Sequence, residues 1–163
     1  MVIFDFTDEL RELALQEASR RQSINEKQGR KGRNQAPEKG DRAFQMHLFG
    51  AAGEIAVAYY MGMEMSLFSD LEPVRDSCDL PGIDVKTRTR HHYDLLVQLS
   101  DDLSKTFVLV TIENQQTRII GWIKGADIKQ VATIHEYVPG RPAYIIKQKY
   151  LNPPWKLRTT VFV

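Results

Sequence analysis

The sequence has little cysteine and no long apolar run. Its one cysteine, Cys78, excludes an internal disulfide, which fits a reducing compartment. The longest apolar stretches are far shorter than the roughly 20 residues of a membrane-spanning helix, and no signal-peptide core is visible. We therefore expect a cytoplasmic protein that does not enter the membrane.

The motifs of several enzyme classes are also missing. No phosphate-binding P-loop, dinucleotide fingerprint or nucleophile elbow occurs in the chain. The four histidines and Cys78 are not spaced as zinc ligands. These absences argue against nucleotide-cofactor, serine-hydrolase and zinc chemistry.

The length and composition are those of one globular domain. The chain has 163 residues and a mass of 18.7 kDa, with 42% hydrophobic and 26% charged residues, which suffices for one core. Residues 26–42 include three glycines and a proline but no aromatic residue. We predict a single domain over residues 1–163 with a mobile basic loop at about residues 26–42.

Charge is unevenly distributed along the chain, although the net charge is only +1. Residues 20–42 hold eight Lys or Arg against three acids, and residues 54–84 hold seven acids against Arg75 alone. After Glu136 there are five basic residues and no acid. An acidic middle between basic flanks suits a metal site that acts on a polyanion, whereas ordinary surface charge is the simpler explanation for any one residue.

Hydrophobic periodicity predicts an α/β protein. Two helices, at residues 8–23 and 43–61, precede a series of strands. This order favours a central mixed β-sheet flanked by helices. The opening residues 2–6 form an edge strand or a packed arm in this prediction. The other predicted elements are strands at 71–75, 83–90, 95–99, 107–112, 118–124 and 144–150 and a short helix at 126–132.

The stretch from Ile83 to Arg88 alternates apolar and polar residues, as a half-buried strand does. Asp84 and Lys86 therefore point the same way, about 6.6 Å apart along the strand. The turn at Pro81 and Gly82 can fold Asp79 back towards them, with Asp76 as a rival for that position. The simpler alternative is an exposed pair of Lys86 with Asp84 on a surface hairpin.

The second predicted helix is nearly apolar but contains one glutamate. Glu54 has only small or apolar residues one turn away in its own helix. Because burial of an unpaired carboxylate is costly, a metal ion, a lysine or a polar network must balance its charge. Glu54 is therefore a candidate site residue.

Together these residues resemble the motif of the PD-(D/E)XK nucleases, the restriction-endonuclease-like superfamily. Asp79 is followed by Gly82-Ile83-Asp84-Val85-Lys86, and the preceding segment Gly50-Ala51-Ala52-Gly53-Glu54 supplies the helix glutamate found in many members. The chain departs from the pattern in three ways: Asp84 stands where Glu is commoner, no proline precedes Asp79, and the gap is short. The resemblance runs from about residue 44 to 157.

The resemblance implies a restriction-endonuclease-like core and a Mg²⁺- or Mn²⁺-dependent nuclease that hydrolyses DNA, as an endonuclease or an exonuclease. It implies that Asp79, Asp84 and Glu54 hold the ion and that Lys86 assists the attacking water. Similar proteins come from phages and bacteria and serve DNA breakdown, recombination or repair. Many are homodimers, although no feature of this sequence demands one.

Basic residues in the loop and after the motif strand are expected to contact DNA phosphates. A different class of function is also compatible with the sequence: a non-catalytic nucleic-acid-binding or interaction protein on the same fold. Cleavage of RNA is a third alternative. The expected DNA-binding residues are Arg30, Lys31, Arg33, Arg88, Arg90 and His91.

Overall fold

The computed structural model describes residues 1–28, 41–65 and 80–158. The chain divides into two compact units, one formed by Met1–Asp5 with Asp76–Val163 and the other by Phe6–Arg75. The prediction of a single domain over residues 1–163 is not tested by this division and stays a prediction. The predicted strand at 71–75 lies outside the described residues.

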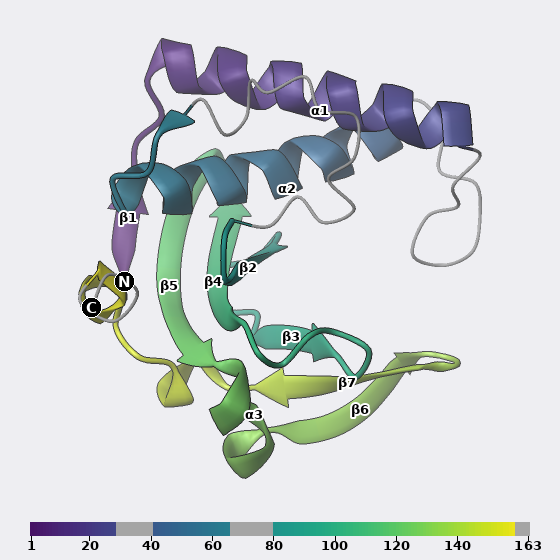
Figure 1. The fold of residues 1–163 in the computed structure, drawn as a ribbon, viewed down its shortest axis with the longest axis vertical. Helices are drawn as coiled ribbons and strands as arrows, with labels where there is room; N and C mark the ends of the chain where they lie inside the picture. Colours follow the sequence, from purple (N-terminus) through teal and green to yellow (C-terminus); the bar gives the residue numbers. More distant parts are fainter. Residues whose placement is uncertain (29–40, 66–79, 159–163) are drawn as a thin grey trace. The chain divides into compact units, whose positions relative to one another are not determined.

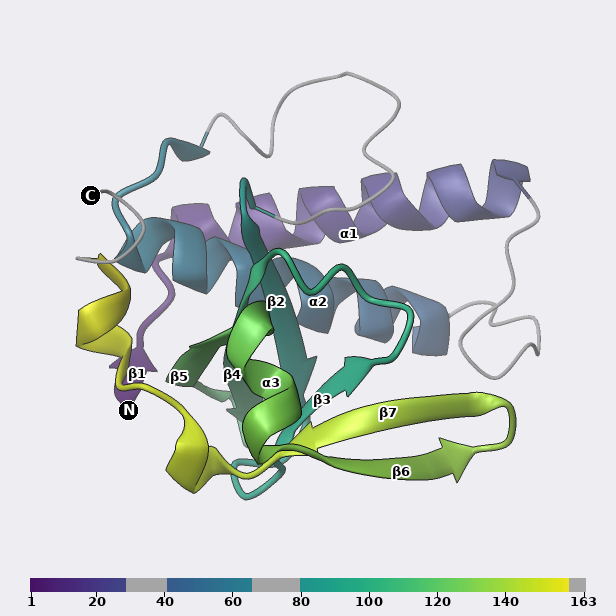
Figure 2. The same ribbon diagram turned by 60° about the horizontal axis from the view of Figure 1, so that its bottom comes forward.

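The described part of the smaller unit contains two long helices, α1 (Asp8–Gln28) and α2 (Asp41–Tyr60). They lie side by side (Figures 1 and 2). The Thr7 hydroxyl accepts a hydrogen bond from the Leu10 N–H at 3.2 Å and so caps α1, a role for which Thr is favoured.

The predicted end of the first helix at residue 23 is wrong, because α1 continues to Gln28, and α2 already begins at Asp41. The predicted loop at 26–42 is therefore too long, and what remains of it lies outside the described residues.

Small side chains are prominent among the buried residues of α1 and α2. Ala14 and Ala18 are buried on α1, and a run of small and apolar residues is buried on α2. Small side chains allow close approach of two helices, as the nearly apolar sequence of α2 predicts. The buried α2 residues are Ala43, Ala51, Gly53, Glu54, Ile55, Ala56, Val57 and Ala58.

The larger unit contains a mixed four-stranded sheet in the order β1-β5-β4-β2 (Figure 1). Strands β1 (Val2–Phe4), β5 (Gln116–Lys124) and β4 (Thr106–Glu113) pair antiparallel, and β2 (Ile83–Arg88) pairs parallel to β4. The α/β class with a mixed sheet is confirmed. The motif strand β2 is an edge strand of this sheet.

A second, antiparallel sheet has the order β3-β7-β6. It contains β3 (Leu95–Gln98), β7 (Arg141–Ile146) and β6 (Thr133–Val138), and the short helix α3 (Gly125–Val131) precedes β6. Figure 2 shows β6 and β7 extending together as a hairpin. This second sheet was not predicted in addition to the mixed sheet, and neither was its strand β6. The predicted last strand at 144–150 is also displaced, since residues Gln148–Tyr150 form a 3-10 turn.

Residues from both sheets and from α3 share one core. Strand β4 contributes the fully buried run Phe107 to Val110, which confirms the prediction of a strand covered on both faces. The core therefore fixes β4, and through parallel pairing it fixes the position of β2. The buried members of the core cluster are Leu95, Val97, Phe107, Leu109, Ile123, Ile128, Tyr144 and Ile146.

Candidate active site

Asp84 and Lys86 lie on the same face of β2, as the alternation predicts. The Lys86 Nζ is 3.0 Å from the Asp84 Oδ2, and the two side chains are 16% and 10% exposed. The ammonium also lies 5.8 Å from the centre of the Phe107 ring. An exposed pair on a surface hairpin does not describe this geometry, because both side chains are largely withdrawn from water.

A third charged residue, Asp101, joins this pair and was not predicted as a site residue. Its Oδ2 is 2.8 Å from the Lys86 Nζ and also accepts the backbone N–H of Gln98 at 2.9 Å. The turn after β3 therefore holds the Asp101 carboxylate in place beside the lysine. In the sequence, Asp101 carries only the signal of a turn residue. We call Asp84, Lys86 and Asp101 the β2 charge cluster.

Asp79 and its rival Asp76 lie outside the described residues, so their place beside Asp84 stays a prediction. Among the residues that the structure describes, no group of three or more His, Cys, Asp or Glu side chains could hold a metal ion. Asp84 and Asp101 do offer carboxylate oxygens, the donors that Mg²⁺ and Mn²⁺ prefer.

Glu54 belongs to the other unit, where a polar network balances its charge. The guanidinium of Arg21 on α1 approaches both carboxylate oxygens, with Nη2 2.6 Å from Oε2 and Nη1 3.4 Å from Oε1. The sequence left open a metal ion, a lysine or a polar network as the group that balances Glu54. The structure provides a polar network through Arg21. Whether Glu54 also meets Asp84 at a metal ion stays a prediction.

The network continues on α1 through Glu17, a buried residue held by two arginines. Arg21 Nε donates to the Glu17 Oε1 at 3.0 Å, and Arg20 donates to both oxygens at 2.6 and 2.9 Å. Burial by itself raises the pKa of Glu17, but the hydrogen bonds and charges of Arg20 and Arg21 outweigh burial and lower this pKa below its ordinary value. Glu17 is therefore held as a carboxylate between the two guanidinium groups.

Of the predicted DNA-binding arginines, Arg88 and Arg90 are described, and both make contacts within the chain. The Arg88 Nη1 donates to the Asp94 carbonyl oxygen at 3.2 Å, and its guanidinium lies 4.8 Å from the Tyr93 ring centre. Arg90 is more exposed, with Nε 3.8 Å from the Glu113 carboxylate. Contact with phosphate stays a prediction for both, and Arg30, Lys31 and Arg33 lie outside the described residues.

The predicted residue His91 is anchored at the end of β4. Its backbone N–H donates to the Glu113 Oε2 at 2.8 Å, and its Nδ1 lies 2.7 Å from the Thr111 hydroxyl. The hydrogen bond from this N–H is the main reason that the pKa of Glu113 falls below its usual value, and the nearby charge of Arg90 adds to it. His91 is thus oriented by β4, and its contact with DNA stays a prediction.

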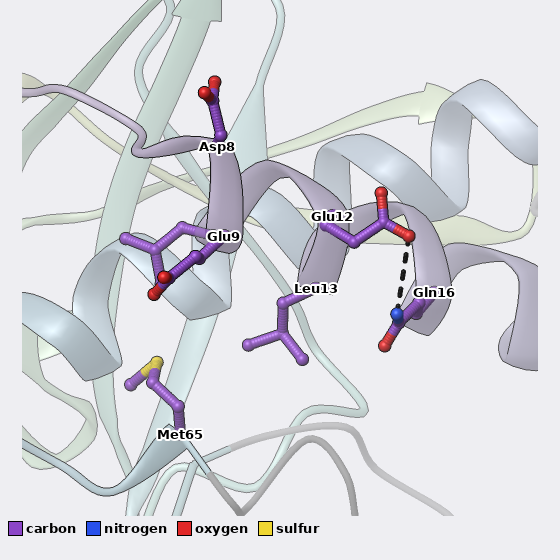
Figure 3. Close-up of a pocket in the computed structure, with 7 residues that line it drawn as sticks. Asp8, Glu9, Glu12, Leu13, Gln16 and Met65 are labelled. Atoms are coloured by element: carbon purple, nitrogen blue, oxygen red, sulfur yellow. Dashed lines mark hydrogen bonds between the residues drawn. The ribbon is translucent and has the colours of Figure 1, made fainter.

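A surface hollow beside the start of α1 was not predicted. Figure 3 shows Leu13 and Met65 at this hollow, while Asp8 points away from Met65 and Glu12 turns toward Gln16. Three acids among its lining residues make it a poor site for phosphate. The lining residues are Asp8, Glu9, Leu10, Glu12, Leu13, Gln16 and Met65.

In the described ranges, no helix has the length and apolar character that crossing a membrane requires. Comparison with protein-family models, with curated proteins and with solved structures found no match. The β2 charge cluster and its surroundings are therefore the features of the chain that bear on its function.

Proposed function

We propose that this protein is a metal-dependent nuclease that hydrolyses phosphodiester bonds in DNA. The observation that carries the proposal is the β2 charge cluster: an acid and a lysine two residues apart on one strand, largely withdrawn from water and in contact at 3.0 Å. This arrangement agrees with the motif of the PD-(D/E)XK nucleases. We also propose that this α/β fold has the restriction-endonuclease-like core of these nucleases.

In the proposed enzyme, Asp84 and Asp79 provide carboxylate oxygens to Mg²⁺ or Mn²⁺, and Glu54 joins them directly or through water. When bound, such an ion makes a coordinated water easier to deprotonate and offsets negative charge on the scissile phosphate. Lys86 then donates a hydrogen bond to the attacking water or to a phosphate oxygen. A cation at this position stabilises the negative charge that develops in the transition state.

Asp101 has a separate role in this proposal, as a positioning residue. Its carboxylate lies 2.8 Å from the Lys86 ammonium and that of Asp84 lies 3.0 Å from it, so two carboxylates hold the ammonium. Because the Gln98 N–H fixes Asp101, the turn after β3 limits the movement of the lysine. A lysine held in one position loses less freedom when the transition state forms.

Removal of divalent ions is expected to abolish cleavage. Labelled single-stranded, duplex and branched DNAs are incubated with the intact chain in Mg²⁺, in Mn²⁺ or in EDTA, and the product lengths are measured. Cleavage with either ion and none in EDTA supports the proposal, and the products separate endonuclease from exonuclease action. Cleavage that persists in EDTA contradicts a metal-dependent mechanism.

Replacement of Asp101 by asparagine is expected to lower the cleavage rate by up to about 100-fold with little change in DNA affinity. Asparagine keeps an oxygen for the Gln98 N–H but removes the charge beside Lys86. The lysine should then react faster with an acylating reagent, which mass spectrometry of the Lys86 peptide measures. Asp101→Glu should recover part of the rate.

The matched control for this prediction is Asp102→Asn. Asp102 lies next in the chain, but its carboxylate accepts hydrogen bonds from the Ser104 N–H and hydroxyl at 3.0 and 2.7 Å. Equal effects of the two substitutions on rate and on Lys86 acylation would show that Asp101 has no specific influence on the lysine.

A non-catalytic nucleic-acid-binding protein is the second candidate. The observation that favours it is that the charges of the β2 charge cluster already neutralise one another in part, since Lys86 contacts both Asp84 and Asp101. Binding of DNA without cleavage under any ion condition would support this candidate against the nuclease.

A further inference from the structure

Two large aromatic side chains are exposed near the C-terminal end of the described chain. Tyr150 is 45% exposed and Trp155 is 63% exposed. In the same stretch, residues 147–158, Pro154 and Leu157 are buried. The segment therefore buries Pro154 and Leu157 and leaves the Tyr150 and Trp155 rings in contact with water. We call residues 147–158 the aromatic segment.

The aromatic segment is fastened to β5 by backbone hydrogen bonds. Trp122 and Asn152 exchange two of them, with the Trp122 N–H donating at 3.0 Å and the Asn152 N–H at 2.7 Å. The indole N–H of Trp122 also donates to the Pro153 carbonyl oxygen at 3.0 Å. A Cβ atom on Gly121 would lie only 2.7 Å from the Asn152 oxygen, so glycine is required for this close approach. The two exposed rings are thus presented on a fixed backbone.

Positive charge accompanies each ring. The Lys149 Nζ lies 5.0 Å from the Tyr150 ring centre, and the Lys156 Nζ lies 5.3 Å from the Trp155 ring centre. Both distances fall within the range of cation–π contacts. Lys147 is also exposed, and the sequence contains no acid after Glu136. A ligand that approaches the aromatic segment therefore meets flat apolar rings beside cations.

We propose that the aromatic segment binds single-stranded nucleic acid, with bases stacked on Tyr150 and Trp155 and phosphates near the lysines. Stacking needs an unpaired base with a free face, and every base has one, so the site requires no particular sequence. The basic charge favours a polyanion over a neutral or acidic peptide. The inference rests on the proposed function in naming DNA as the ligand, and it adds a site outside the β2 charge cluster.

Tryptophan fluorescence provides a direct test because the two tryptophans differ in exposure. Trp155 is open to solvent, whereas Trp122 is 5% exposed. A short oligothymidine strand, titrated into the intact chain in EDTA so that no cleavage occurs, should quench the Trp155 emission. Trp155→Ala should lose the quenching, and Trp155→Ala and Tyr150→Ala should each weaken binding by about 5- to 150-fold in an anisotropy assay.

Salt dependence tests the charged part of the site. In Lys149→Ala, the slope of log affinity against log salt concentration should become shallower by about 0.7, the value for one phosphate contact on a single strand. Tyr137→Ala is the matched aromatic control, since Tyr137 is 66% exposed on β6 but follows the acid Glu136. This control should bind the strand as the unchanged chain does.

Three outcomes would overturn the inference: no quenching by the strand, equal affinity for a blunt duplex, or equal losses in Tyr137→Ala and Trp155→Ala. The result is separable from the test of the nuclease. A chain that never cleaves DNA but shows Trp155-dependent quenching disproves the proposed nuclease and supports the aromatic segment. Cleavage without that quenching supports the nuclease and disproves the binding role of the aromatic segment.

Discussion

Lys86→Ala is expected to reduce DNA cleavage by at least about 100-fold while leaving DNA affinity largely unchanged. A positioned proton donor or acceptor typically contributes between about 10²- and 10⁴-fold to a rate. Lys86 is the only cation in the β2 charge cluster, and it stands 3.0 Å from Asp84, the acid of the same motif. Single-turnover cleavage with saturating enzyme measures the chemical step apart from binding.

The same substitution also removes a charge from a largely buried group of ions, so a fold control is needed. Asp84 and Asp101 would both lose their contact with the ammonium, and their mutual repulsion would lower the free energy of unfolding. Lys86→Arg keeps the positive charge between them and should retain the fold. It should still lose most cleavage, because a guanidinium cannot reproduce the geometry of the ammonium and does not give up its proton near neutral pH.

Lys129→Ala is the matched control for Lys86→Ala, since Lys129 is an exposed lysine on α3. It should cleave at the rate of the unchanged chain. Asp84→Ala should behave as Lys86→Ala does if Asp84 provides a ligand to the ion. Undiminished cleavage by both Lys86→Ala and Asp84→Ala would disprove the proposed site, whatever the fold of the domain.

Regular elements with a strong hydrophobic pattern were predictable from the sequence. Strands β4 and β5 and helix α2 were predicted close to their observed bounds, because continuous apolar runs allow few alternatives. The common direction of Asp84 and Lys86 was also predictable, since the alternation of side chains along a strand depends on the backbone alone. Local periodicity therefore located the motif and oriented it.

Features set by pairing between distant segments were not predictable in the same way. All six residues of β6 are exposed, so its sequence has no buried apolar face from which a strand could be predicted. The strand depends on its hydrogen bonds to β7. A signal was available, because Pro139 and Gly140 form a turn in which Gly140 has a φ of +78°. The division into two sheets and the edge position of β2 likewise follow from long-range pairing.

Two contacts of the candidate site residues were not predicted for the same reason. Asp101 reaches Lys86 from a turn 15 residues later in the chain, and Arg21 reaches Glu54 from another helix. The sequence predicted that Glu54 needs a balancing group, because burial of an unpaired carboxylate is unfavourable. It could not predict which arginine supplies that group, since many basic residues lie in the same part of the chain.

Arg21→Ala is expected to lower the free energy of unfolding by about 3–5 kcal/mol, the usual effect of removing one partner of a buried ion pair. Glu54 and Glu17 are both buried, and the Arg21 guanidinium contacts both of them. Chemical denaturation near neutral pH measures the loss. Arg11→Ala is the control, because Arg11 is an exposed arginine of the same helix and should change the stability little.

The dependence on pH should separate the contribution of Glu17. Its pKa in the folded protein is below the ordinary value of 4.5, so the stability that it provides is present above about pH 4.5 and is lost as the pH falls through the lower folded value. Arg21→Ala removes one of the two guanidinium groups that lower this pKa. The difference in stability between Arg21→Ala and the unchanged chain should therefore shrink in acid.

A double substitution tests whether the loss comes from the buried charge of Glu54. Arg21→Met with Glu54→Gln should be more stable than Arg21→Ala alone, because the carboxylate is removed together with its partner. If Arg21→Ala is no less stable than Arg11→Ala, another group balances Glu54. In that case, a loss of stability in Arg21→Ala when EDTA removes divalent ions would assign this role to a cation and connect Glu54 with the proposed metal site.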